Sequence, residues 1–258
     1  MAAVHIKSSP ASAATRLAAG YDGLDLQARL ALARQEIDGR VVLTTSFGLE
    51  DQAITHAIVS QGLAIELVTL DTGRLFPETY EVWSETERRY GVRIRGFSPE
   101  QRALEDLVAR QGIDGFRETV AARNACCGVR KVAPLARALD GAAGWITGMR
   151  AEQSVTRADT AAAAFDAARS LVKVNPLFDW LRGDVQDYVR IHDIPYNKLH
   201  DRGFLSIGCA PCTRAVKPGE PERAGRWWWE QDDKKECGLH NRPPAQVKRP
   251  ADRVLADG

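Results

Sequence analysis

The sequence predicts an α/β fold in which a mostly parallel, twisted sheet is flanked by helices. From Val41 onwards, β-rich apolar runs alternate with helix-like segments, a rhythm typical of βαβ units. The chain has 258 residues, of which 44% are hydrophobic, so it can bury one substantial core but not that of a second full domain. Ligands in such folds bind at the carboxyl ends of the strands, so we look for functional residues in the loops that follow them.

The expected elements follow from β-branched, apolar runs and from the helical patterns between them. Strands are expected at residues 41–45, 64–70, 92–95, 145–147 and 171–174. Helices are expected at residues 49–59, 77–90 and 132–139, followed by a polar helix at about 184–191. Residues 1–20, rich in Ala and Ser, are predicted to be a disordered tail, although an organelle transit peptide has a similar composition. The Pro-containing residues 241–258 are also predicted to be a disordered tail.

Charge and hydropathy limit the classes of partner. The chain has 35 basic and 34 acidic residues, a formal net charge of +1, which gives no overall field for nucleic acid or a membrane surface. No apolar run reaches the roughly 18 residues that span a bilayer, and no secretory signal is recognisable. We therefore expect a cytoplasmic protein with no nucleic-acid or membrane partner, in which any anion site is local.

The five cysteines divide into two pairs and one isolated residue. Cys126 and Cys127 are adjacent, Cys209 and Cys212 are separated by Ala-Pro, and Cys237 stands alone near the C-terminus. The cytosol keeps thiols reduced, so two pairs there indicate an iron-sulfur cluster or a structural zinc site. Adjacent helical residues project about 100° apart, so Cys126 and Cys127 can serve one site only near a bend or a helix end.

The first expected strand is joined to its helix by a loop suited to an anion. Ser46 and Gly48 lie at the helix N-terminus, where free amides and the helix dipole favour a phosphate and Gly48 allows close approach. Phe47 and Asp51 belong to the same loop and are also candidate ligand-binding residues. An ordinary capped βα turn has the same composition.

Two further loops follow strands of the predicted sheet. Asp71, Thr72 and Gly73 follow the second strand, and two such loops on neighbouring strands indicate a nucleotide, with Ser46 near its phosphate and the second loop near ribose or base. The fourth strand leads into residues 147–157, where Arg150 and other donors suit an anionic ligand. A solvated surface loop is the alternative for this last segment.

Several motifs, in consistent order over about residues 40–240, resemble those of the assimilatory adenylyl-sulfate reductases. They are Ser-Phe-Gly-Leu-Glu-Asp (46–51), Leu-Asp-Thr-Gly-Arg-Leu-Phe-Pro (70–77), Cys-Cys-Gly-Val-Arg-Lys (126–131), Gly-Met-Arg (148–150), Cys-Ala-Pro-Cys (209–212), Arg-Ala-Gly-Arg-Trp (223–227) and Glu-Cys-Gly-Leu-His (236–240). The last motif is highly specific. The resemblance implies a Rossmann-like fold similar to the adenine nucleotide alpha-hydrolases, a [4Fe-4S] cluster, and thioredoxin-dependent reduction of adenylyl sulfate to sulfite and AMP.

The resemblance also assigns roles to residues. It implies that Cys237 is the nucleophile, that it forms an S-sulfonate, and that Lys131, Arg223, Arg226 and His240 bind the phosphosulfate. Cationic donors suit this step because a thiolate that approaches a sulfate meets anionic oxygens. The two cysteine pairs would hold the cluster, which leaves no second free thiol in the chain. The sulfonate must therefore be removed by an external dithiol, thioredoxin or a glutaredoxin-like donor.

The chemistry suggests a division of the chain. Residues 21–218 are predicted to form the nucleotide- and cluster-binding domain. Residues 219–240 are predicted to be a mobile catalytic segment, because Cys237 must meet both the bound substrate and a protein dithiol. Lys131 follows Cys127 by about one helical turn, and we hypothesise that its ammonium links the cluster to the bound sulfate. Of Trp227 to Trp229, at least one is expected in the core while another covers a ligand or partner.

Three alternatives remain at this point. Reduction of the 3′-phosphorylated substrate, phosphoadenylyl sulfate, uses the same mechanism, although many relatives specific for it lack both cysteine pairs. An ATP-pyrophosphatase-like sulfur transferase acting on RNA predicts a Ser-Gly-Gly loop and a basic surface, which this chain lacks. A zinc-binding or redox-sensing regulatory module leaves the nucleotide loops and Cys237 unexplained. A homo-oligomer is compatible with all of them.

Overall fold

Six strands form one sheet in the order β3-β2-β1-β4-β6-β5. The computed structural model describes residues 9–230, 236, 238 and 239. The strands are β1 Val41–Thr45, β2 Glu66–Leu70, β3 Arg95–Phe97, β4 Gly144–Ile146, β5 Ala163–Asp166 and β6 Leu171–Val174. All neighbouring strands are parallel except β5, which runs antiparallel to β6 at the edge. This confirms the predicted α/β class with a mostly parallel sheet.

The order of the strands produces a crevice beside β1. From β1 the chain proceeds outwards through β2 to β3, and then returns to place β4 on the other side of β1. At such a switch point the loops after the two central strands diverge, which opens a binding crevice at their carboxyl ends. The loops that follow β1, β2 and β4 are those in which the sequence predicts ligand contacts.

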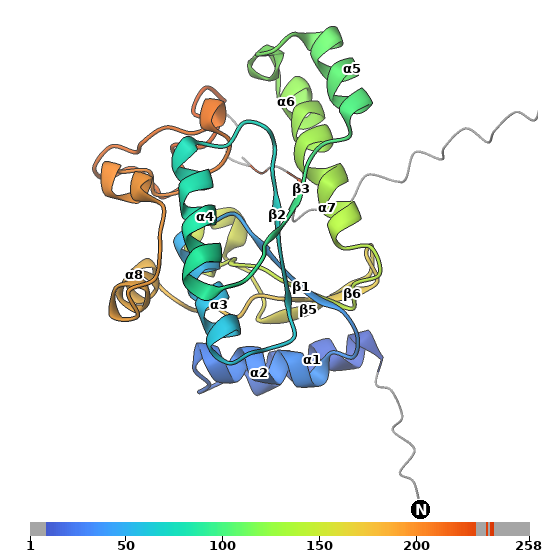
Figure 1. The fold of residues 1–258 in the computed structure, drawn as a ribbon, viewed down its shortest axis with the longest axis vertical. Helices are drawn as coiled ribbons and strands as arrows, with labels where there is room; N and C mark the ends of the chain where they lie inside the picture. Colours follow the sequence, from blue (N-terminus) through green and yellow to red (C-terminus); the bar gives the residue numbers. More distant parts are fainter. Residues whose placement is uncertain (1–8, 231–235, 237, 240–258) are drawn as a thin grey trace, which may run out of the picture.

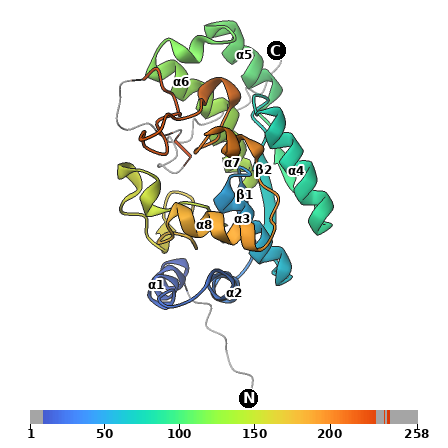
Figure 2. The ribbon, with the colours of Figure 1, turned by 90° about the vertical axis from the view of Figure 1, so that its left-hand side faces the viewer.

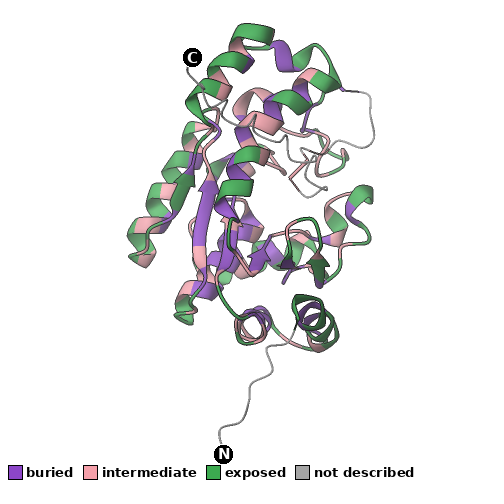
Figure 3. Ribbon diagram, turned by 90° about the vertical axis from the view of Figure 1, so that its right-hand side faces the viewer, coloured by how far each residue is buried: buried purple, intermediate pink, exposed green. Residues whose placement is uncertain are grey.

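Helices cover both faces of the sheet because side chains alternate along each strand. Val41 and Leu43 belong to the larger core cluster, whereas Val42 belongs to a second cluster with Trp145 and Leu135. The helices are α1 Pro10–Gly20, α2 Leu26–Glu36, α3 Leu49–Ser60, α4 Pro77–Tyr90, α5 Gln101–Gln111, α6 Val120–Cys127, α7 Ala133–Ala138 and α8 Arg182–Ile191. Figures 1 and 2 show α1 and α2 together at the end opposite α5 and α6, and Figure 3 shows the buried strands between the helices. None of the described helices combines the length and the apolar character that crossing a bilayer would require.

The prediction of a disordered tail over residues 1–20 is wrong from Pro10 onwards. Those residues form α1, which begins with Pro10 and is capped by Ser9, whose Oγ accepts a hydrogen bond from the Ser12 amide at 3.2 Å. Leu17 is fully buried in the larger core cluster. The Ala-rich composition that indicated a tail also has high helix propensity, and a single buried stripe is enough to dock the helix.

The other element predictions differ from the structure mainly at the periphery. The strands at 41–45 and 171–174 and the helix at 77–90 are confirmed, but the third strand lies at Arg95–Phe97 instead of 92–95. The elements α2, α5, α6 and β5 were not predicted from the sequence, and β5 is a short edge strand that pairs with β6. The helix expected at 132–139 is confirmed as α7 Ala133–Ala138, and a π-helical turn that was not predicted, η2 Gly128–Val132, directly precedes it. Of the expected mobile segment and C-terminal tail, residues 231–235, 237 and 240–258 lie outside the described residues.

Candidate functional site

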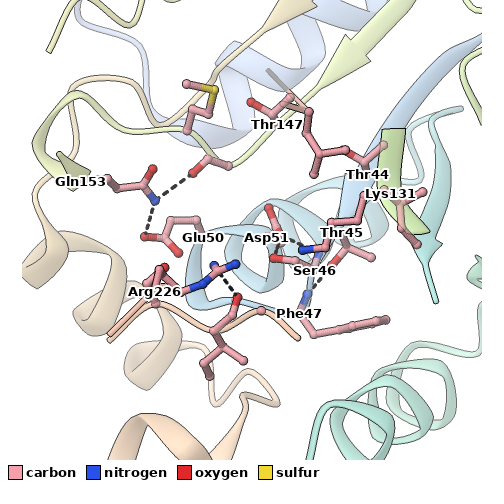
Figure 4. Close-up of a pocket in the computed structure, with 18 of the residues that line it drawn as sticks. Thr44, Thr45, Ser46, Phe47, Glu50, Asp51, Lys131, Thr147, Gln153 and Arg226 are labelled. Atoms are coloured by element: carbon pink, nitrogen blue, oxygen red, sulfur yellow. Dashed lines mark hydrogen bonds between the residues drawn. The ribbon is translucent and has the colours of Figure 1, made fainter. Parts of the chain in front are cut away.

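A cavity of about 190 Å³ lies at the carboxyl ends of β1, β2 and β4. Its lining gathers eight of the predicted site residues, which come from four separate segments of the chain: Ser46, Phe47, Gly48, Asp51, Thr72, Lys131, Arg223 and Arg226. Figure 4 shows the β1 loop, Thr147, Gln153, Lys131 and Arg226 arranged around this space. The cavity therefore lies where the strand order predicts a ligand site.

The loop after β1 is braced by the carboxylate of Asp51. Its Oδ2 accepts hydrogen bonds from the Ser46 backbone amide at 2.6 Å and from Ser46 Oγ at 2.7 Å. Burial raises the pKa of Asp51 to about 6, even though the hydrogen bonds from Ser46 favour the ionised form. In the part of the chain that the structure describes, no side chain caps α3, whose N-cap is Gly48, so the positive end of this helix is available to an anion in the cavity.

The strained position in this loop is Phe47, and Gly48 has ordinary backbone geometry. Phe47 has a φ of 60° and Gly48 a φ of −70°. The Phe47 ring is buried and stacks on Trp83 with ring centroids 5.6 Å apart. This stacking fixes the turn, because a bulky residue adopts positive φ only where its surroundings stabilise it.

The loop after β2 contributes Thr72 to the cavity, whereas Asp71 and Gly73 shape the turn. Asp71 Oδ1 accepts hydrogen bonds from Tyr80 Oη at 2.7 Å and from the Gly73 amide at 2.9 Å. Thr72 Oγ1 lies 3.3 Å from Cys209 Sγ, and its carbonyl accepts a hydrogen bond from Arg130 at 2.6 Å. Asp71 and Gly73 do not line the cavity, so the structure gives only Thr72 of this predicted trio a place at the ligand site.

The loop after β4 approaches α3 so closely that only glycine fits at position 148. A Cβ atom there would lie 2.5 Å from Asp51 Oδ1 and 2.9 Å from Glu50 Cβ. Gln153 and Arg157, further along this loop, both line the cavity. The predicted donor-rich loop is thus at the site, but through residues other than Arg150.

Arg150 lies behind the cavity wall and binds carboxylates of the protein. Its side chain has no exposed surface and pairs with Glu50 at 2.8 Å, Glu152 at 2.8 Å and Glu222 at 3.0 Å. Burial raises the pKa of Glu50, but Arg150 and Gln153 outweigh that effect and hold it below its usual range. The predicted contact of Arg150 with a ligand is therefore replaced by a structural one, since three carboxylates already engage its guanidinium.

The four paired cysteines converge on a second, smaller cavity. Cys126, Cys127, Cys209 and Cys212 are all buried and all line it, although the two pairs are far apart in the sequence. The expected helix end is present, because α6 ends at Cys127 and a π-helical turn follows. Within the described residues, no group of three or more His, Cys, Asp or Glu side chains is arranged to hold a single metal ion.

Cationic side chains surround the thiols of this cavity. Among the described residues its lining has one lysine, four arginines and no carboxylate; the cationic residues are Arg74, Arg123, Arg130, Lys131 and Arg226. Burial raises the pKa of the Cys126 thiol, and it raises that of Cys212 to about 11. Burial also opposes ionisation of Cys209, but Lys131, Thr72 and Arg226 outweigh it and lower the Cys209 pKa. The cavity is therefore suited to four sulfur ligands around a group of negative charge.

Three residues line both cavities. They are Lys131, Arg226 and Trp227. The guanidinium of Arg226 requires Gly208, because a Cβ there would lie 2.2 Å from Arg226 Nη2. Trp227 is fully buried and Arg226 stacks over its ring at 4.7 Å, whereas Trp228 is 39% exposed. One of the three tryptophans is thus in the core, as predicted, and it forms a wall between the two cavities.

The segment that carries the predicted nucleophile contacts the larger cavity. Glu236 pairs with Arg157 at 3.0 Å and with Arg223 at 3.2 Å, and Leu239 lines the cavity. Cys237 and His240 lie outside the described residues. The two predicted roles for those residues therefore remain predictions, although their described neighbours in the sequence are at the site.

Several residues of the cavity wall were not predicted from the sequence. Glu222 and His200 line the cavity, and both ring nitrogens of His200 are buried without a hydrogen-bond partner among the described residues. Glu222 precedes Arg223 directly, so its position in the motif could have drawn attention to it. His200 gave no such signal, because it belongs to a short 3₁₀ turn with no recognisable spacing.

Comparisons with known proteins agree with this geometry. The family model of the phosphoadenosine phosphosulfate reductase domain matches residues 40–215. The adenosine 5′-phosphosulfate reductase of Agrobacterium fabrum is 56% identical over 236 residues, which cover 91% of this chain and 90% of that protein. The protein of the same name from Allochromatium vinosum is 53% identical over 208 residues, covering 81% of each. The crystal structure of phosphoadenylyl-sulfate reductase from Candida auris matches in fold, with a TM-score of 0.67, 24% identity and coverage of 79% of this chain and 96% of that one.

Proposed function

The chain belongs to the phosphoadenosine phosphosulfate reductase family, and from this premise we propose that it reduces adenylyl sulfate to sulfite and AMP in sulfate assimilation. Relatives more than 50% identical over most of the chain bear the name adenosine 5′-phosphosulfate reductase, which favours the substrate without a 3′-phosphate. The observation that carries the proposal is the pair of adjoining cavities, one at the strand ends and one lined by four thiols, which share Lys131 and Arg226.

The larger cavity has the groups that an adenylyl sulfate requires. The N-terminus of α3 and Ser46 are suited to its phosphate. Lys131, Arg223 and Arg226 supply positive charge for the sulfate and for the phosphate that departs. Because these cations come from η2 and from the segment after Cys212, their position depends on the tertiary structure around the thiol cavity.

The first chemical step is a displacement at sulfur. The Cys237 thiolate donates an electron pair to the sulfuryl sulfur, and the bond between that sulfur and the bridging oxygen breaks. AMP leaves with the electron pair of that bond, and Cys237 keeps the sulfonate. Cationic side chains stabilise the negative charge that grows on the departing phosphate.

The second step needs an external dithiol, such as thioredoxin or a glutaredoxin-like protein. One thiolate of the donor attacks the Cys237 sulfur, and sulfite leaves with the electron pair of the sulfur–sulfur bond. The second donor thiol then breaks the mixed disulfide, which restores Cys237 and leaves the donor oxidised. This cycle requires a reducing compartment, so we also propose that the protein acts in the cytoplasm.

We propose that Cys126, Cys127, Cys209 and Cys212 hold a [4Fe-4S] cluster. The four buried thiols and the five surrounding cations fit a cluster ligated by thiolates, which carries net negative charge. When bound, the cluster would supply a fixed charge and redox-active iron next to Lys131. The residues of this chain then orient the substrate and stabilise its anionic groups.

Intact mass tests the function. The anaerobically purified protein is exposed briefly, without reductant, to adenylyl sulfate or to its 3′-phosphorylated analogue at matched limiting concentrations. We expect a sulfonate adduct that forms faster with adenylyl sulfate and is absent from Cys237→Ser. Addition of reduced thioredoxin is expected to remove the adduct and release sulfite.

Each other outcome changes a different part of the proposal. Faster labelling by the phosphorylated analogue keeps the mechanism and changes the substrate. A protein that gains no adduct from either compound, with its visible absorption intact, contradicts the reductase function.

A further inference from the structure

The carboxylate of Glu236 forms ion pairs with two cationic side chains of the substrate cavity. Its carboxylate accepts hydrogen bonds from Arg157 Nε at 3.0 Å and Nη2 at 3.1 Å, and from Arg223 Nη2 at 3.2 Å. Both arginines line the cavity in which the proposed function places a phosphosulfate. A glutamate carboxylate and a sulfate or phosphate group offer a guanidinium the same pair of anionic oxygens.

The position of Glu236 is set from the thiol side. Its backbone carbonyl accepts a hydrogen bond from Arg123 Nη1 at 2.8 Å, and Arg123 lines the thiol cavity. The other end of the Arg123 guanidinium pairs with buried Glu230 at 2.6 Å. Glu236 therefore has a fixed backbone anchor while its side chain extends to the arginines of the substrate cavity.

The charges around this carboxylate keep it ionised. Burial raises the pKa of Glu236, but Arg157 and Arg223 outweigh burial and lower it below its usual range. The side chains of Arg157, Arg223 and Glu236 are between 10% and 16% exposed, so water screens these pairs only in part. An incoming anion can thus replace Glu236 without leaving the two arginines unpaired.

We propose that Glu236 is an internal counter-ion that holds Arg157 and Arg223 in the free protein and is displaced by the phosphosulfate group of the substrate. This inference rests on the proposed function and adds a role for the glutamate that precedes the nucleophile. Substrate binding exchanges one pair of carboxylate oxygens for another on the same arginines. The exchange runs in reverse after the first chemical step, so Glu236 competes with AMP and favours its release.

Such competition lowers the affinity for anionic nucleotides only. In Glu236→Gln the side chain keeps its shape but loses its charge, so Arg157 and Arg223 lose the negative charge that Glu236 places beside them in the free protein. We expect adenylyl sulfate and AMP to bind about 3- to 10-fold more tightly, the range for one or two partly exposed ion pairs. Adenosine, which lacks the anionic group, should bind with unchanged affinity.

Calorimetric titration of the full chain, with its cluster, measures these affinities. The Cys237→Ser background prevents reaction with adenylyl sulfate, and AMP and adenosine are titrated alongside. Glu220→Gln is the matched control, because Glu220 lies in the same segment and pairs with Arg214, outside the substrate cavity. A double-mutant cycle with Arg157→Met then tests whether Glu236 acts through that arginine.

The outcomes separate this inference from the proposed function. A Cys237→Ser protein that does not bind adenylyl sulfate contradicts the function itself. If that protein binds adenylyl sulfate, two results contradict the role of Glu236 as an internal counter-ion. One is that Glu236→Gln changes the affinities for adenosine and AMP equally, and the other is that it weakens the binding of AMP alone. If Glu220→Gln raises the affinity for AMP as much as Glu236→Gln does, the effect is a general one of charge. The same holds if Glu236→Gln raises the affinity equally in the Arg157→Met background. Either result would overturn the proposal.

Discussion

At the scale of single residues, Arg150 shows that the role of an arginine depends on the carboxylates that the fold places beside it. A loop with arginines after a β-strand is typical of an anion site, and that pattern predicts a ligand contact for Arg150. In the structure three glutamates take its donors, and two of them, Glu50 and Glu222, line the cavity. Arg150 therefore positions two wall residues, one on α3 and one in the segment that carries Arg223.

Replacement of Arg150 should cost stability. Arg150→Met leaves the mostly buried carboxylate of Glu50 without its counter-ion, although Glu222 keeps Arg182 at 3.5 Å, so we expect the free energy of unfolding to fall by about 3–5 kcal/mol. Urea denaturation measures this, with Arg190→Met as control because its pair with Asp187 is largely exposed. Loss of nucleotide binding with unchanged stability would instead restore Arg150 as a ligand contact.

Asp51 gives the site a dependence on pH. Its pKa is raised from 3.8 to about 6 by burial, so the folded state favours the protonated carboxyl. The contribution of the protonated Asp51 carboxyl to the stability of the fold is complete below the pKa of the unfolded state, 3.8. It is lost as the pH rises through the pKa of the folded state, about 6.

The stability of the protein relative to Asp51→Asn should follow this curve. Between pH 4 and pH 7 we expect the unsubstituted protein to lose up to about 3 kcal/mol of unfolding free energy relative to Asp51→Asn. Denaturant titrations of both proteins at matched pH values cancel the contributions of other groups. A difference that stays constant with pH would show that the Asp51 carboxyl titrates normally.

At the scale of elements, α1 and α6 illustrate two ways in which local patterns mislead. The Ala-rich α1 has the composition of a tail, yet its buried residues Ala13, Ala14 and Leu17 dock it on the sheet. In α6 the adjacent cysteines could not share a site on a continuous helix, and the helix ends at Cys127 before a π-helical turn that carries Lys131. Because α6 ends at Cys127, the two adjacent cysteines can face the same cavity.

A substitution within α1 tests whether it belongs to the folded domain. Leu17 is fully buried, and Leu17→Ala should lower the free energy of unfolding by about 2–5 kcal/mol through the cavity it leaves. Thr15→Ala, on the exposed face of the same helix, is the control. Equal stability of the two variants would mean that residues 10–20 are dispensable, as in a tail.

At the scale of the whole molecule, two cavities built from distant segments share a wall. Lys131 lies between the thiols and the proposed sulfate site, and its charge helps to lower the pKa of Cys209. A negatively charged cluster would hold this ammonium in place and so influence the affinity of the neighbouring cavity. The hypothesis that Lys131 links the two sites thus has a defined geometry.

Removal of the proposed cluster should therefore weaken substrate binding. In the Cys237→Ser background we expect chelation of iron to lower the affinity for adenylyl sulfate by at least about 5-fold, with that for adenosine unchanged. Loss of visible absorption monitors the removal, and circular dichroism confirms that the protein stays folded. In Lys131→Met the same treatment should have little further effect. Unchanged affinity for adenylyl sulfate in folded, cluster-free protein would contradict the link.

By itself the sequence determined the α/β class, the loops after β1, β2 and β4 that contribute to the site, and the grouping of the cysteines, because these depend on local periodicity and on motifs. Only the tertiary structure decided that Arg150 pairs with glutamates and that Lys131 lines both cavities. The same holds for the ion pairs of Glu236 with Arg157 and Arg223. Those contacts join segments 70 or more residues apart in several cases, such as Arg150 with Glu222. Such pairings follow from how helices and strands pack and from which charges are buried together, which no local pattern encodes.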